Sequence, residues 1–212
     1  GEPVVAVIAP RRRNRSDDGC GMATHAGARE LIRLHKEEKL SFKNVITFNL
    51  DEYYPMKPDA KQSYHRFMSE QLFAHVDIDQ ANVHIPDGTI EKSKVRQYAE
   101  AFEQKIVDLG GIDLQVLGIG LNGHIGFNEP GASVTSKTRI AALENNTRLA
   151  NAYEFDNVSQ VPRLALTLGI STILSAKRIV LMAFGASKAE IVQQSVEGPV
   201  TDSVPASFLQ EH

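Results

Sequence analysis

The chain has 212 residues, of which 42% are apolar and 23% are charged, and its formal net charge is −3. These values are ordinary for a globular protein, and so small a charge argues against a nucleic-acid or anionic-membrane partner. The sequence also contains no apolar run of the roughly 18 residues that a membrane-spanning helix needs.

The length predicts a single domain over residues 1–212. Because the chain opens on Gly1 directly before a predicted strand, we expect it to begin, and also to end, inside a larger protein. Cys20 is the only cysteine, which excludes an internal disulfide and favours the reducing cytoplasm.

Short apolar runs alternate with amphipathic stretches, a pattern typical of βαβ units around a parallel sheet. Strands are expected at Val4–Ala9, Asn44–Asn49, Val83–Ile85, Asp113–Leu117, Thr138–Leu143, Arg163–Leu168 and Arg178–Phe184. Helices are expected at Ala28–Lys39, Ser63–Phe73 and Lys92–Leu109, and after a capping box at Ser187–Glu190. The sequence thus predicts an α/β, Rossmann-like fold, with an open, mostly parallel twisted sheet and helices on both faces.

A glycine-rich loop follows the strand expected at Asp113–Leu117, in the place where α/β proteins usually carry their chemistry. It reads Gly118-Ile-Gly-Leu-Asn-Gly-His-Ile-Gly-Phe-Asn-Glu-Pro-Gly131. Its first half matches the dinucleotide-binding pattern G-x-G-x-x-G, for which Glu144 would be the ribose-binding acid. That site needs a helix directly after the glycines, and Gly126 and Pro130 disfavour one.

The rival interpretation takes His124 and Glu129 of this loop as a working pair. A carboxylate on one imidazole nitrogen fixes the tautomer and leaves the other nitrogen for proton transfer. Gly120 and Gly123 would let the backbone approach a ligand closely. The alternative is a loop histidine satisfied by backbone and water, and the surrounding residues favour the acid/base pair.

Further polar groups are expected at the same edge of the sheet. Asp51 and Glu52 follow the strand at Asn44–Asn49, and because neighbours on a strand point apart, they should serve different ends. Lys188 lies at the start of a helix, where free N–H groups favour an anion. An acidic turn and a plain capped helix remain the alternatives for these two segments.

Several motifs resemble the glucosamine-6-phosphate deaminases. They are Phe48–Tyr53, Ser63–Met68 and Gly118–Gly131, and the resemblance covers about residues 30–212. It implies reversible conversion of glucosamine 6-phosphate to fructose 6-phosphate and ammonia, without a metal or organic cofactor. By the family's pattern, Asp51 moves a proton between C2 and C1 of the sugar.

The resemblance also implies roles for the remaining candidates. His124 would assist ring opening, oriented by Glu129 and supported by Asn122, whose position is aspartate in some members. Lys188 would contact the phosphate, and Thr24 belongs to the start of the family's phosphate loop. Glu52, Gly120 and Gly123 are further candidate substrate contacts. A homo-oligomer that binds a small sugar phosphate is expected.

The chain departs from the family's pattern at the phosphate end. The polar run Arg11–Arg15 stands where most of the phosphate loop is expected, and Tyr153 stands where the family carries an arginine. These departures leave open a non-catalytic sugar-phosphate sensor on the same fold. A dinucleotide-dependent oxidoreductase is the remaining alternative.

Overall fold

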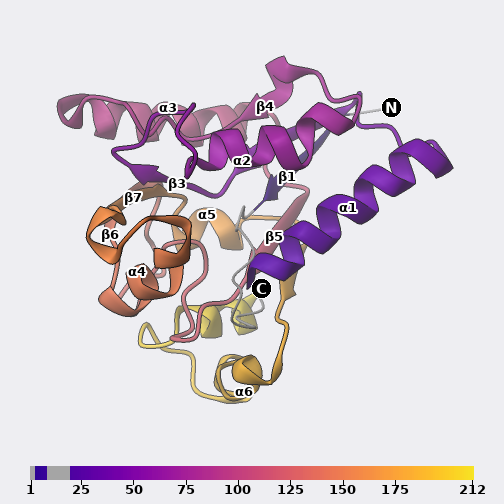
Figure 1. The fold of residues 1–212 in the computed structure, drawn as a ribbon. Helices are drawn as coiled ribbons and strands as arrows, with labels where there is room; N and C mark the ends of the chain where they lie inside the picture. The colour runs from indigo at the N-terminus through magenta and orange to yellow at the C-terminus, as the bar shows by residue number, and fades with distance from the viewer. Residues whose placement is uncertain (1–2, 9–19) are drawn as a thin grey trace.

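The structure is a computed structural model that describes residues 3–8 and 20–212, with the backbone alone for residues 20–26. Its centre is a 5-stranded sheet in the order β4-β2-β1-β5-β8, and every pairing in this sheet is parallel (Figure 1). The strands are β1 (Val4–Ile8), β2 (Val45–Asn49), β4 (Val83–His84), β5 (Leu114–Gly118) and β8 (Ile179–Met182). The predicted parallel α/β fold is confirmed.

A second sheet of 3 antiparallel strands lies beside the first, in the order β3-β7-β6. It consists of β3 (Asp51–Tyr54), β6 (Arg139–Ala142) and β7 (Leu164–Thr167). The sequence located β6 and β7, but it did not predict β3 as a strand or a separate sheet. Pairing direction depends on distant partners: β3 pairs with β7, more than a hundred residues further along the chain.

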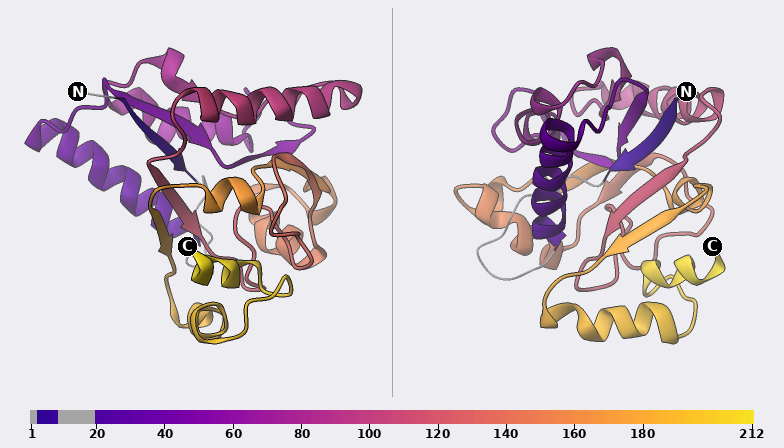
Figure 2. Two further views of the ribbon diagram at one scale, coloured as in Figure 1. Left: turned by 180° about the vertical axis from the view of Figure 1, so that it is seen from behind. Right: turned by 90° about the vertical axis from the view of Figure 1, so that its right-hand side faces the viewer.

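Helices cover both faces of the parallel sheet, as predicted (Figure 2). On one face, α1 (Cys20–Glu38) and α2 (Tyr64–Gln71) pack together through Ala28, Phe67 and Met68. On the other face, α3 (Val95–Asp108) and α5 (Ile170–Leu174) enclose the largest apolar cluster, which includes Val5, Phe102 and Ile173. The remaining α-helices are α4 (Asn145–Asn151) and α6 (Ala189–Glu197).

Short 3₁₀ turns complete the structure, at Phe73–His75, Gln80–Asn82, Lys92–Lys94, Ala152–Glu154, Val158–Gln160, Ala186–Lys188 and Pro205–Glu211. Across the described residues, none of the helices combines the length and the apolar character that crossing a bilayer requires.

The two predicted helix starts have different outcomes. Ser63 caps α2, where its side chain accepts a hydrogen bond from the backbone N–H of His65. The capping box predicted at Ser187–Glu190 is wrong. Gly185, with φ 87°, begins a 3₁₀ turn at residues 186–188, so Ser187 lies inside that turn and α6 starts only at Ala189.

Candidate active site

The candidate residues converge on one edge of the parallel sheet. Asp51 comes shortly after β2, the His124 loop follows β5, and Lys188 follows β8 (Figure 1). Because β2, β1, β5 and β8 are successive parallel strands, their carboxyl ends meet at the same edge. This is the edge where open α/β sheets bind ligands.

His124 and Glu129 lie in direct contact. The Nδ1 atom of His124 is 3.3 Å from Oε2 of Glu129 and 2.7 Å from Oδ1 of Asn122. The Nδ2 atom of Asn122 donates to Oε2 of Glu129 at 2.9 Å. His124 is 4% exposed and Glu129 7%. Since both neighbours of Nδ1 are acceptors, Nδ1 carries the proton, and Nε2 is left as the basic nitrogen.

The environment of Glu129 keeps this carboxylate ionised. Burial alone would raise its pKa, but the hydrogen bond and charge of His124, with hydrogen bonds from Thr147 and Asn122, lower the pKa to about 2. The backbone N–H of Glu144 also donates to Oε1 of Glu129 at 3.3 Å. Thr147 was not identified from the sequence, because its contact spans the chain from the loop to α4.

Gly120 leaves the space that the ring of His124 occupies. A methyl group at this position would lie 2.2 Å from Cε1 and Nδ1 of His124 and 2.5 Å from Nε2, so only glycine fits beside the ring. Gly123 lies on the far side of the loop, where its carbonyl accepts from the N–H of Ala206 at 2.8 Å. The close approach expected at Gly120 therefore involves the histidine ring, and ligand contacts of both glycines stay a prediction.

Asp51 is joined to the His124 loop through Thr167. Asp51 is 1% exposed and pairs in register with Thr167 at the end of β7. The hydroxyl of Thr167 accepts a hydrogen bond from the backbone N–H of Phe127, within the loop, at 3.2 Å. The amide of Asn128 adds a bond to the carbonyl oxygen of Leu168 at 2.9 Å. Thr167 and Asn128 thus connect the two predicted proton-transfer segments, a link that no local sequence pattern indicates.

Glu52 follows Asp51 in β3, and alternation along a strand places these two neighbouring side chains on opposite sides. One oxygen of Glu52 accepts from the N–H groups of Tyr53 and Tyr64, and the other from Oγ of Ser63 and the N–H of His65. Burial raises the pKa of Glu52, and these hydrogen bonds oppose the rise. The structure therefore places Glu52 at the start of α2 and not beside His124.

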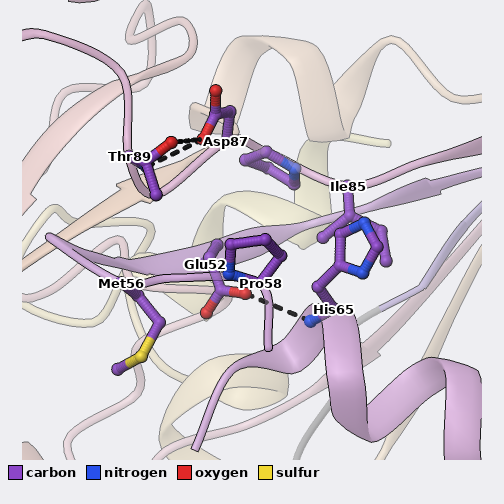
Figure 3. A pocket seen from close by; sticks show the side chains of 9 residues that line it. Glu52, Met56, Pro58, His65, Ile85, Asp87 and Thr89 are labelled. Atoms are coloured by element: carbon purple, nitrogen blue, oxygen red, sulfur yellow. Dashed lines mark hydrogen bonds between the residues drawn. The ribbon is translucent and has the colours of Figure 1, made fainter. Parts of the chain in front are cut away.

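Glu52 also lines a surface cavity of about 260 Å³. Met56, His65 and Asp87 are among the other lining residues, and Figure 3 shows the carboxylate of Glu52 among them with its bond to His65. The substrate contact expected of Glu52 stays a prediction.

The residues expected to contact the substrate's phosphate lie only partly within the described chain. Lys188 is 3% exposed at the end of the turn before α6. It lies three residues before Ile191, whose side chain reaches Gly123, so this side of α6 faces the His124 loop. Thr24 lies on α1, where its side chain is outside the described part, and Arg11–Arg15 lie outside the described residues. Tyr153 is exposed on a short turn, with its hydroxyl 3.0 Å from Glu154.

The dinucleotide interpretation requires a helix directly after Gly123, and the described residues 119–144 contain none. The loop instead continues through turns and an isolated bridge between Ile125 and Asn128. The described part of the chain also holds no group of three or more His, Cys, Asp or Glu side chains that could bind a metal ion.

Comparison with known proteins decides the family. The family model described as glucosamine-6-phosphate isomerases/6-phosphogluconolactonase matches residues 21–212. A glucosamine-6-phosphate deaminase of Rhodopirellula baltica is 46% identical across 99% of this chain and 84% of that protein. The chain belongs to the glucosamine-6-phosphate isomerase/6-phosphogluconolactonase family.

Two further proteins define how the chain fits this family. A deaminase-like protein of Bacteroides thetaiotaomicron is 48% identical across 86% of this chain, which spans only 28% of that protein's length. The solved structure of a monomeric glucosamine-6-phosphate deaminase superposes with a TM-score of 0.91 and 42% identity, over 99% of this chain and 82% of that one. The resemblance seen in the sequence is thereby confirmed, whereas the expected homo-oligomer stays a prediction.

Proposed function

We propose that this protein converts glucosamine 6-phosphate and water to fructose 6-phosphate and ammonia. The observation that carries the proposal is the hydrogen-bonded set of His124, Asn122 and Glu129, at the same sheet edge as the buried Asp51. The Rhodopirellula baltica relative, named as a glucosamine-6-phosphate deaminase, supports this substrate.

The first step is opening of the sugar ring. The O1 hydroxyl must lose a proton and the ring oxygen must gain one, so a single group that accepts and then donates can serve both atoms. His124 offers Nε2 for this transfer, because Nδ1 is held by Asn122 and Glu129. Glu129 orients the ring and stabilises its charged form, in the same way that a carboxylate supports other catalytic histidines.

The second step moves hydrogen between carbons. Asp51 takes the proton from C2 and returns it to C1, so the aldose becomes a ketose imine. Water then adds to C2 and ammonia leaves, which consumes one water for each ammonia released. A buried, well-positioned carboxylate can perform the transfer, and the step itself needs no electrons from a cofactor.

Lys188 and Thr24 are the proposed phosphate contacts. A lysine as buried as Lys188 interacts with a dianion more strongly than a solvated one does, because less water screens the pair. The lone Cys20 fits a cytoplasmic enzyme, and assembly into a homo-oligomer remains part of the proposal.

The test is release of ammonia from glucosamine 6-phosphate, followed through a coupled dehydrogenase. Asp51→Asn preserves the shape of the side chain and should lower kcat by about 10²–10⁴-fold. Asp108→Asn, an exposed change at the end of α3, should leave kcat unaltered. Wild-type protein that releases no more ammonia than Asp51→Asn would overturn the proposal.

A further inference from the structure

Glu144 lies beside the His124 site, in contact with Asn122. The Nδ2 atom of Asn122 donates to Oε2 of Glu129 at 2.9 Å and to Oε2 of Glu144 at 3.1 Å. A side-chain amide carries two N–H groups, so both are used by carboxylates. The amide oxygen is then the atom that meets Nδ1 of His124, at 2.7 Å.

Glu144 makes this contact at the start of a helix. It holds the N-cap position of α4, where a side-chain oxygen commonly accepts from the helix backbone. Within the described chain, the Glu144 side chain forms no such capping bond. It reaches back across 22 residues to Asn122 instead.

The contact with Glu144 strengthens the orientation of the Asn122 amide, which Glu129 and the backbone N–H of His124, a donor to Oδ1 at 3.3 Å, also favour. A half-turn of the amide would set its oxygen against the carboxylates of Glu129 and Glu144, and its NH₂ group against the Nδ1–H of His124. Each of those contacts would be repulsive. The carboxylate of Glu129 alone favours the observed orientation of the amide, and the carboxylate of Glu144 strengthens that preference.

We propose that Glu144 is a positioning residue for the deaminase reaction. By holding the amide of Asn122, it keeps the proton of neutral His124 on Nδ1 and leaves Nε2 facing the substrate. The inference rests on the proposed function, because it assigns Nε2 of His124 the proton transfer of ring opening.

The same geometry makes Glu144 the partner of asparagine in particular. An aspartate at position 122 would accept from Nδ1 with either oxygen and would need no orienting partner. In this protein, an aspartate at position 122 would place a third carboxylate within hydrogen-bond distance of Glu129 and Glu144, and the like charges would repel one another. Glu144 therefore supports Asn122 and would oppose an aspartate in its place.

Glu144→Ser separates this role from a structural one, because serine is a good N-cap for α4. We expect an unchanged or higher melting temperature, a kcat about tenfold lower, and a KM within about twofold of wild type, as for other partners one contact away from a reacting group. Glu144→Gln keeps an oxygen that can accept from Asn122 and should recover most of the kcat.

Asn122→Asp supplies the second arm of the experiment. Asn122→Asp alone should lower kcat, as Glu144→Ser alone does. The double variant should nevertheless have a higher kcat than Asn122→Asp, because it lacks the carboxylate that repels the new aspartate. A double variant no better than Asn122→Asp would overturn the inference, as would full kcat in Glu144→Ser.

A third readout does not depend on turnover. The ¹⁵N resonances of His124, assigned by comparison with His124→Gln, distinguish an N–H at Nδ1 from one at Nε2. Wild type should show the Nδ1–H form, and Glu144→Ser a mixture. A wild type without ammonia release would refute the proposed function, while these spectra would still decide the role of Glu144. Spectra unaltered by Glu144→Ser would refute the inference.

Discussion

Substitution of Gly120 by alanine tests whether the histidine depends on space that only glycine provides. The added methyl carbon would stand 2.2 Å from two atoms of the His124 ring. Carbon atoms in contact normally lie about 3.5–4.0 Å apart, so the ring must retreat by more than about 1 Å. Its bond of 2.7 Å to Asn122 and its contact of 3.3 Å with Glu129 then break.

The cost of this displacement follows from the hydrogen bonds that break. A hydrogen bond to a charged group contributes about 1.5–3 kcal/mol, so breaking the bond to Glu129 should lower the free energy of unfolding by roughly that much. A displacement of about 1 Å at a reacting group costs about 10²-fold in rate. We therefore expect Gly120→Ala to fold with reduced stability and to lose at least about 10²-fold in kcat.

The assay is ammonia release together with urea unfolding. Gly27→Ala is the matched control, because a methyl group there meets no atom of the described residues within 4 Å. It should retain activity and gain about 0.5–1 kcal/mol as a helical glycine replaced by alanine. In a His124→Ala background the ring is absent, so Gly120→Ala should cost much less stability. An equal cost in both backgrounds would refute the reasoning.

Two further predictions concern the buried carboxylates. The pKa of Glu129 is lowered from 4.5 to about 2 in the folded protein, so its stabilisation is complete above about pH 4.5 and is lost as the pH falls toward 2. This stabilisation amounts to about 3 kcal/mol. In urea unfolding, the free energy of unfolding of Glu129→Gln should therefore fall less steeply below pH 4.5 than that of wild type; an equally steep fall in both proteins would contradict the prediction. Glu52→Ala leaves Oγ of Ser63 and the N–H of Tyr64 without their acceptor, and it leaves the N–H of His65 with Oγ of Ser63 alone, so the free energy of unfolding should fall by about 3 kcal/mol. The exposed Glu70→Ala, which removes only a surface pair with Arg66, should change it by less than about 1 kcal/mol; equal losses in both variants would exclude the capping role of Glu52.

Local patterns were enough to predict much of this molecule. The apolar runs predicted the parallel strands, and glycines with a proline after β5 predicted a loop instead of a helix. Strand alternation, applied to the residues after Asn44–Asn49, predicted that Asp51 and Glu52 serve different ends, and the partners of Glu52 at the start of α2 agree with this. These features depend on neighbours within a few residues, so a single sequence contains them.

Other features depend on pairings between distant segments. Asp51–Tyr54 was not predicted as a strand of a second sheet, because its partner β7 lies far along the chain. The capping box at Ser187–Glu190 was wrong because Gly185 begins the turn earlier than the pattern assumes. In the sequence, Glu144 entered only as the ribose-binding acid of the disfavoured dinucleotide interpretation, and the fold alone reveals its bond to Asn122.

The two proposed proton-transfer groups belong to different sheets: Asp51 begins the antiparallel sheet, and His124 lies in the loop after β5 of the parallel sheet. Leu50 joins them, since its N–H donates to Ile8 at 2.8 Å and its carbonyl accepts from Leu168 at 2.9 Å. The separation between Asp51 and His124 therefore depends on how the two sheets pack at Leu50. Substitutions at this joint would change that separation while both side chains stay in place.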